Sequence, residues 1–141
     1  MEFKKCGEGL PQSMWETYSS FANTFGGTIV LGIDERNGNI VSGVNDPDKI
    51  LKDLWDTVNN PNRVNINLLQ EDDVEIRTIQ GRTIILVHVP RARRELRPVF
   101  LNNNLNSGTY RRNGQGDYHC TLNEIRRVGG KRGRWEVTGY R

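Results

Sequence analysis

The chain has 141 residues, of which 35% are hydrophobic and 26% charged, with two cysteines and a formal net charge of +3. This length is typical of one domain, which can fold around an apolar core without disulfides. The composition excludes collagen-like, coiled-coil and disordered chains, and no apolar run is long enough to span a membrane. The N-terminus has no apolar signal-peptide region. We therefore expect a single cytoplasmic domain with free thiols and no membrane partner.

The charge is distributed unevenly along the chain. Residues 1–90 contain 8 Lys and Arg against 13 Asp and Glu, a net charge of −5. Residues 91–141 contain 12 Lys and Arg against 4 Asp and Glu, a net charge of +8. A basic C-terminal third indicates a polyanionic partner, although a solubilising tail would give the same asymmetry.

Two amphipathic helices are predicted in the first half of the chain. Apolar side chains recur every three or four positions over residues 10–25, and a Gly-Gly pair follows as a stop, as expected for one buried helix face. A second helix is predicted over 47–58, with Asp46 as its N-cap and Pro47 in its first turn.

The remaining segments favour strands. Residues 28–33 place Ile29, Leu31 and Ile33 on one face, and Asn37-Gly38 predicts a hairpin to a partner strand at 40–44. Further strands are predicted at 64–70, 74–79, 83–90, 98–102 and 108–113. Because 83–90 is apolar on both faces, we expect it to be a central strand.

The ordered part of the chain is expected to end in a short helix at 121–128, where Thr121 and Glu124 form a capping box. The predicted fold class is α+β: a mixed β-sheet with two main helices packed on it and a short C-terminal helix. We assign residues 1–128 to one domain and residues 129–141 to a basic tail rich in Gly and Arg.

Common nucleotide and zinc motifs are missing. The glycine-rich stretches lack the spacing of a P-loop or of a dinucleotide fingerprint, so no ATP motif is found. Cys6, His88, His119 and Cys120 lack the paired spacing of zinc ligands. We interpret His88 as an ordinary strand side chain and Cys120 as a small buried residue.

Acidic residues are predicted at the ends of strands. Glu2, Asp34 and Glu35 occupy such positions, where carboxylates can hold a divalent cation that activates water for phosphodiester cleavage. The alternative is that Glu2 pairs with Lys4 along one strand face, while Asp34 and Glu35 begin a hairpin turn.

Basic residues gather later in the chain. The strand Tyr110-Arg111-Arg112 follows four upstream arginines, namely Arg91, Arg93, Arg94 and Arg97. The guanidinium fork fits phosphate oxygens, and an aromatic ring can stack on a base. An ordinary edge strand protected by charge would explain the same pattern.

These segments, in their order, resemble the Schlafen AlbA-like domain over roughly residues 2–128. The chain opens with Glu2-Phe3-Lys4, and Ala-Asn-Thr-Phe-Gly-Gly at 22–27 runs directly into a strand ending in Gly-Ile-Asp at 32–34. Arg-Pro-Val-Phe at 97–100 and Gly-Thr-Tyr-Arg-Arg-Asn-Gly at 108–114 complete the set. We expect the block at 22–27 to be architectural, because Asn23 can bond a nearby turn and the glycines permit a backbone reversal.

The resemblance implies a nucleic-acid-binding α+β domain, found in bacterial and archaeal transcriptional regulators. The family is sometimes labelled an ATPase, a label that the missing P-loop does not support. Some Schlafen proteins cleave transfer or ribosomal RNA with three acidic residues. Glu2 and Asp34 match two of them, and the other would precede residue 1.

We predict a nucleic-acid-binding domain of a transcriptional regulator, with DNA as the expected ligand, RNA as the alternative, and no cofactor needed for binding. Phosphates would be bound by Arg91, Arg93, Arg94, Arg111 and Arg112, and Tyr110 would stack on a base or sugar. The alternatives are an endoribonuclease that uses Glu2 and Asp34 with Mg²⁺ or Mn²⁺, and a module that forms a homodimer through exposed sheet edges.

Overall fold

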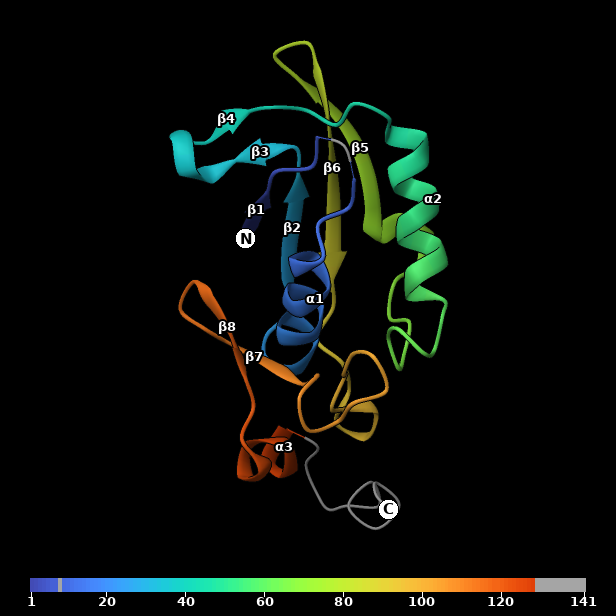
Figure 1. The fold of residues 1–141 in the computed structure, drawn as a ribbon, viewed down its shortest axis with the longest axis vertical. Helices are drawn as coiled ribbons and strands as arrows, with labels where there is room; N and C mark the ends of the chain where they lie inside the picture. The colour runs from blue at the N-terminus through green and yellow to red at the C-terminus, as the bar shows by residue number, and fades with distance from the viewer. Residues whose placement is uncertain (8, 129–141) are drawn as a thin grey trace.

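The protein is built on a four-stranded sheet with the strand order β1-β2-β6-β5 (Figure 1). The computed structural model describes residues 1–7 and 9–128, so the predicted tail at 129–141 lies outside the described residues. The sheet strands are β1 (Glu2–Lys4), β2 (Gly27–Leu31), β5 (Val74–Ile79) and β6 (Arg82–Val89). β1 is parallel to β2 and the other neighbours are antiparallel. The predicted mixed sheet, with its central strand at 83–90, is confirmed.

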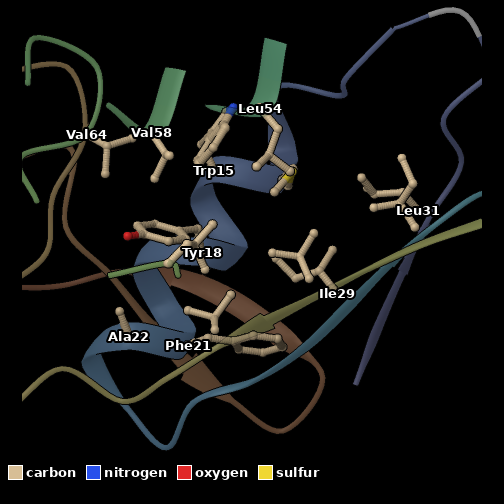
Figure 2. Packing of buried hydrophobic residues seen from close by; sticks show 14 of the residues in the cluster. Trp15, Tyr18, Phe21, Ala22, Ile29, Leu31, Leu54, Val58 and Val64 are labelled. Carbon is tan, nitrogen blue, oxygen red and sulfur yellow. The ribbon is translucent and has the colours of Figure 1, made fainter. Parts of the chain in front are cut away.

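Within residues 1–7 and 9–128, three α-helices accompany the sheet: α1 (Ser13–Asn23), α2 (Pro47–Val58) and α3 (Leu122–Val128). Figure 2 shows Trp15, Tyr18 and Phe21 of α1 in one buried cluster with residues of β2 and α2, with Phe21 near Ile29 and Trp15 near Leu54. Leu54 and Val58 of α2 belong to the same buried cluster. One apolar core therefore joins both main helices to one face of the sheet, and the α+β fold class is confirmed.

The predicted helix caps are present. The Asp46 carboxylate accepts a hydrogen bond from the backbone N of Lys49 at 3.2 Å. At α3, the backbone N of Thr121 donates to Glu124 at 2.8 Å, and the backbone N of Glu124 donates to the Thr121 hydroxyl at 3.2 Å. Each cap satisfies backbone donors that the first helical turn leaves free.

The predicted strand 28–33 is interrupted at Gly32, whose φ of +110° ends β2. The chain continues as the hairpin β3 (Ile33–Asp34) and β4 (Ile40–Val41), joined through the 3₁₀ turn η1 (Glu35–Asn37). The expectation that Ile33 shares the core face of Ile29 and Leu31 is wrong. Ile33 instead lines an apolar groove with Val30, on the other face of the sheet.

The segments 64–70 and 98–102 were predicted to be strands, and neither forms one. Each contributes isolated bridges only, such as Val64 with Leu101. Side chains take the place of a neighbouring strand: the Tyr18 hydroxyl donates to the carbonyl of Ile66 and accepts from the backbone N of Leu68, each at 2.9 Å. The segments therefore contribute apolar residues to the core while their backbones pair with polar side chains.

A second hairpin, missed in part by the sequence analysis, packs against α1. It consists of β7 (Tyr110–Asn113), within the predicted strand 108–113, and β8 (Gly116–His119), which was not predicted. The remaining 3₁₀ turns are η2 (Glu71–Asp73) and η3 (Arg94–Leu96). In Figure 1 the β7–β8 hairpin, η3 and α3 lie at the same end of the molecule.

Among the described residues, every helix is too short or too polar to cross a membrane.

Candidate nucleic-acid interface

Residues 90–97 follow β6, and we call them the basic loop. The segment at 22–27 fixes the position of this loop. The backbone N of Ala92 donates to the carbonyl of Ala22 at 2.9 Å. Gly26 has a φ of +75°, and a Cβ at this position would lie 2.9 Å from the carbonyl oxygen of Val89 and 3.0 Å from the backbone N of Arg91. Glycine is therefore required here both for its backbone conformation and for the close approach of the basic loop.

Three of the predicted phosphate-binding residues lie together in the basic loop. Arg91, Arg93 and Arg94 are exposed. Within residues 1–7 and 9–128, none of the three forms an ion pair with a carboxylate. Three unpaired guanidinium groups on one short, anchored loop form a surface suited to polyanions.

Arg97 ends the basic loop and differs from its neighbours in burial. Its residue is only 9% exposed, and its Nε is buried with no hydrogen-bond partner in the described chain. Burial, followed by the positive charges of Arg91 and Arg94, lowers the pKa of the Arg97 guanidinium, against a smaller opposing effect of Glu95. In the sequence Arg97 is one of four neighbouring arginines and looks like the others, because its burial depends on tertiary packing.

Phe25 stands beside this cluster and is 84% exposed. The predicted helix 10–25 placed its ring on the buried apolar face, and this is wrong, because α1 ends at Asn23. The guanidinium carbon of Arg91 lies 5.9 Å from the centre of the Phe25 ring, a cation–π contact. An exposed aromatic ring and an unpaired arginine thus share one surface.

Arg112, in contrast, lies inside the protein, with a side chain 12% exposed. Its guanidinium pairs with Glu2 at 2.8 Å and with Asp117 at 2.9 Å. It also lies 5.0 Å from the centre of the Phe21 ring. The structure places Arg112 in an internal ion-pair network that ties β1 to the β7–β8 hairpin.

Asp117 was missed by the sequence analysis. Its carboxylate accepts hydrogen bonds from the hydroxyls of Thr17 and Ser20 on α1, in addition to its pair with Arg112. In the sequence, Asp117 follows a turn and carries no periodic signal. Its role depends on the packing of the hairpin against α1.

The other two predicted residues on β7 are also engaged. Arg111 pairs with Glu124 of α3 at 2.8 Å, and its guanidinium carbon lies 5.6 Å from the centre of the Tyr118 ring. Tyr110 is 9% exposed, and its ring lies 4.4 Å from that of His119, centre to centre. Burial, more than the carboxylates of Glu16 and Asp117, raises the pKa of Tyr110.

The expectation that Asn23 is architectural is confirmed. Asn23 is 5% exposed, and its Nδ2 donates to the carbonyls of Val99 and Tyr110, each at 2.9 Å. Its Oδ1 accepts from the backbone N of Val99 at 2.8 Å. The hydroxyl of Ser19 donates to the same Val99 carbonyl at 2.7 Å and accepts from the backbone N of Tyr110 at 3.1 Å. These two side chains join α1 to the segment after the basic loop and to β7.

Glu2 and Asp34 contact different cations. Glu2 pairs with Arg112 and, at 3.5 Å, with Lys4, as the alternative interpretation expected. Asp34 accepts a hydrogen bond from the backbone N of Arg36 at 3.1 Å and caps the turn η1. Among the described residues, no group of three or more His, Cys, Asp or Glu is placed to hold a metal ion. Catalysis by Glu2 and Asp34 stays a prediction.

His88 is a strand side chain, as interpreted from the sequence. Its Nδ1 lies 3.0 Å from the Thr28 hydroxyl and its Nε2 lies 2.7 Å from the Glu75 carboxylate.

Cys120 is 5% exposed, and Cys6 is fully buried. Both cysteines are free thiols.

Comparison with known proteins shows that the chain matches one protein family. The family model described as Schlafen, AlbA_2 matches residues 1–121. No curated protein matches the chain.

Two solved structures are similar to this fold. One is the N-terminal domain of a protein from Nitrosomonas europaea, named as RecG-related and as a candidate ATP-dependent DNA helicase. It is 31% identical with a TM-score of 0.60, and the match covers 86% of this chain and 82% of that one. The other is the DIP2311 protein from Corynebacterium diphtheriae, which is 18% identical with a TM-score of 0.59, over 84% of this chain and 21% of that one. The second likeness concerns the fold alone, and the present chain spans about a fifth of that protein.

Proposed function

This chain belongs to the Schlafen AlbA_2 family, and from this premise we propose that it is a nucleic-acid-binding domain whose contact surface is the basic loop. The observation that carries the proposal is the set of three exposed arginines, Arg91, Arg93 and Arg94, which have no carboxylate partner in the described chain. The hydrogen bond from Ala92 to Ala22 and the close approach that Gly26 permits hold the backbone of their loop in place before any ligand arrives.

The physical basis is electrostatic. Each guanidinium presents two parallel N–H groups that match two phosphate oxygens. Neutralising a backbone phosphate releases condensed counterions, so binding depends on salt and only weakly on sequence. Arg112 would have to give up two ion pairs to contact a phosphate, and we therefore propose that it positions the hairpin instead.

We propose DNA as the ligand, with support from the similar domain from N. europaea, which belongs to a protein named as related to a DNA helicase. The alternatives of an RNA ligand, a Mg²⁺- or Mn²⁺-dependent ribonuclease and a homodimer stay predictions. The same holds for the setting in a transcriptional regulator and for the cytoplasmic location.

The test is a titration of the ¹⁵N-labelled domain with a short DNA duplex and with its separated strands, followed by amide NMR shifts. We expect the largest changes at Gly26 and in the basic loop, because these amides lie beside the exposed arginines. Amides of α2 serve as the internal control. Shifts confined to the β7–β8 hairpin or to α2, or no shifts with any strand, would contradict the proposal.

A further inference from the structure

Two residues of the candidate interface, Phe25 and Arg97, have surroundings that attraction between exposed arginines and phosphates does not explain. The first is Phe25, a large apolar side chain that is 84% exposed. Burial of such a ring is normally favourable, and here it is exposed to solvent with the Arg91 guanidinium 5.9 Å from the ring centre. An exposed ring beside an arginine can receive the flat face of a nucleobase.

The second feature is Arg97. A largely buried arginine, such as this residue at 9% exposed with its Nε buried, is normally paired, because an uncompensated charge away from water is unfavourable. Arg112 shows the paired case in the same protein, with two carboxylates. Arg97 has none in the described chain, and its Nε has no hydrogen-bond partner. An anion bound at this place would supply the hydrogen-bond acceptor and the negative charge that Arg97 lacks.

We propose that the basic loop and Phe25 form a binding site for an unpaired nucleic-acid strand, with a base on the Phe25 ring and a backbone phosphate at Arg97. Arg91 links the two positions: it contacts the Phe25 ring and its charge acts on Arg97. This inference rests on the proposed function and adds the class of ligand, a strand whose bases are free of a duplex.

The choice of an unpaired strand follows from the ring. In a duplex, each base is already stacked and its face is closed to a protein side chain unless it is flipped out. A single strand offers every base face without that penalty, and stacking tolerates any sequence. Phosphate contacts from Arg93 and Arg94 alone would serve duplex and single strand alike.

The experiment compares one labelled oligonucleotide as a single strand, as its blunt duplex, and as the RNA of the same sequence. We expect the wild-type domain to bind single strands more tightly than the duplex. Phe25→Ala should weaken single-strand binding roughly 5- to 100-fold and leave duplex binding nearly unchanged, whereas Phe25→Trp should retain it. Ile40→Ala, at another exposed apolar residue, is the matched control. The DNA and RNA arms decide which sugar the strand carries.

Arg97 is tested with two variants, because a buried residue can affect folding. Arg97→Lys keeps the charge and loses the fork, and Arg97→Met removes the charge; thermal unfolding checks that each is folded. We expect both to weaken single-strand binding several-fold. An oligonucleotide with a 5′-phosphate, compared with one ending in 5′-OH, separates a terminal phosphate from a backbone one, and equal affinities are expected.

The outcomes separate this inference from the proposed function. Equal affinity for single strand and duplex, unaffected by Phe25→Ala, overturns the inference while nucleic-acid binding stands. Unchanged single-strand affinity in folded Arg97→Lys and Arg97→Met overturns the phosphate position. No binding of any strand contradicts the proposed function itself.

Discussion

Arg97 and Arg112 are both largely buried, yet they lie in opposite electrostatic surroundings. Arg112 has the carboxylates of Glu2 and Asp117 within 3 Å, whereas the nearest charges that act on Arg97 include two further arginines. A buried guanidinium with two carboxylate partners contributes to the fold, whereas Arg97 has no ion pair within the described chain and is the one that we propose to hold a phosphate. Charge counting in the sequence treats the two alike.

We predict that Arg112→Met destabilises the domain by about 3 kcal/mol, the lower end of the range for breaking a buried ion pair. The substitution leaves the half-buried carboxylates of Glu2 and Asp117 without their common cation. Urea unfolding measures the change. Arg111→Ala is the control, because its pair with Glu124 is more exposed and should contribute less than about 1 kcal/mol. Equal, small losses for both variants would contradict the assigned role of Arg112.

The buried side chain of Asn23 is also expected to stabilise the domain. Asn23→Ala leaves the N–H and C=O of Val99 and the C=O of Tyr110 without this partner, and we expect a loss of roughly 2–4 kcal/mol. Asn123→Ala, at an exposed position of α3, should change stability by less than about 0.5 kcal/mol. Chemical unfolding of both variants under the same conditions makes the comparison. A loss for Asn23→Ala no larger than that for Asn123→Ala would show that the buried network is dispensable.

Elements were predictable from the sequence where their signals are local. The caps at Asp46 and Thr121 and the turn at Asn37-Gly38 each depend on neighbouring residues, and each is found. The segments 64–70 and 98–102 have the composition of strands, but their backbones bond to side chains of Tyr18, Asn23 and other residues from distant parts of the chain. Strand pairing is a tertiary property, and composition does not specify it.

Gly26 allows the backbone of the basic loop to pack closely against the segment that follows α1. Gly26→Ala adds a Cβ against Val89 and Arg91 at a positive φ, and we expect a loss of roughly 1–3 kcal/mol together with weaker nucleic-acid binding. Gly81→Ala is the matched control: its φ is +74° and no atom lies within 4 Å of the added Cβ. Thermal unfolding and a binding titration are read together. Equal effects of the two substitutions on binding would contradict a positioning role for Gly26.

For the molecule as a whole, the net charge of +8 over residues 91–141 does not say which positive charges are available to a ligand. Arg111 and Arg112 pair with Glu124, Glu2 and Asp117, whereas Arg91, Arg93 and Arg94 have no carboxylate partner in the described chain. The sequence predicted three arginines, Arg91, Arg93 and Arg94, that the structure places exposed in one loop, and a polyanionic partner for them stays a prediction. It could not predict which arginines are paired, nor that Phe25 is exposed, because both depend on how distant segments pack.

The burial of Cys6 and Cys120 in the folded domain predicts how their thiols ionise and react. Burial raises the pKa of Cys6 and of Cys120 from 9.0 to about 11. Since the folded state holds these protons more tightly, this contribution to stability is complete below pH 9 and is lost as pH rises toward about 11. We expect both thiols to react with a disulfide reagent at neutral pH only after unfolding. We also expect the urea midpoint to fall between pH 9 and pH 11 more than in the Cys6→Ala, Cys120→Ala double variant. Rapid labelling of the native protein would contradict this burial.

Binding of nucleic acid by the basic loop can be measured through the salt dependence of affinity. The measurement compares the wild-type domain with the triple variant Arg91→Ala, Arg93→Ala, Arg94→Ala, between about 50 and 200 mM salt. A triple variant of three exposed cations elsewhere, Lys49→Ala, Lys52→Ala and Arg82→Ala, is the control. We predict that loss of the loop arginines flattens the slope of log affinity against log salt by roughly two to three units, while the control keeps the wild-type slope. An unchanged slope in the loop variant, or an equal change in the control, would contradict the account.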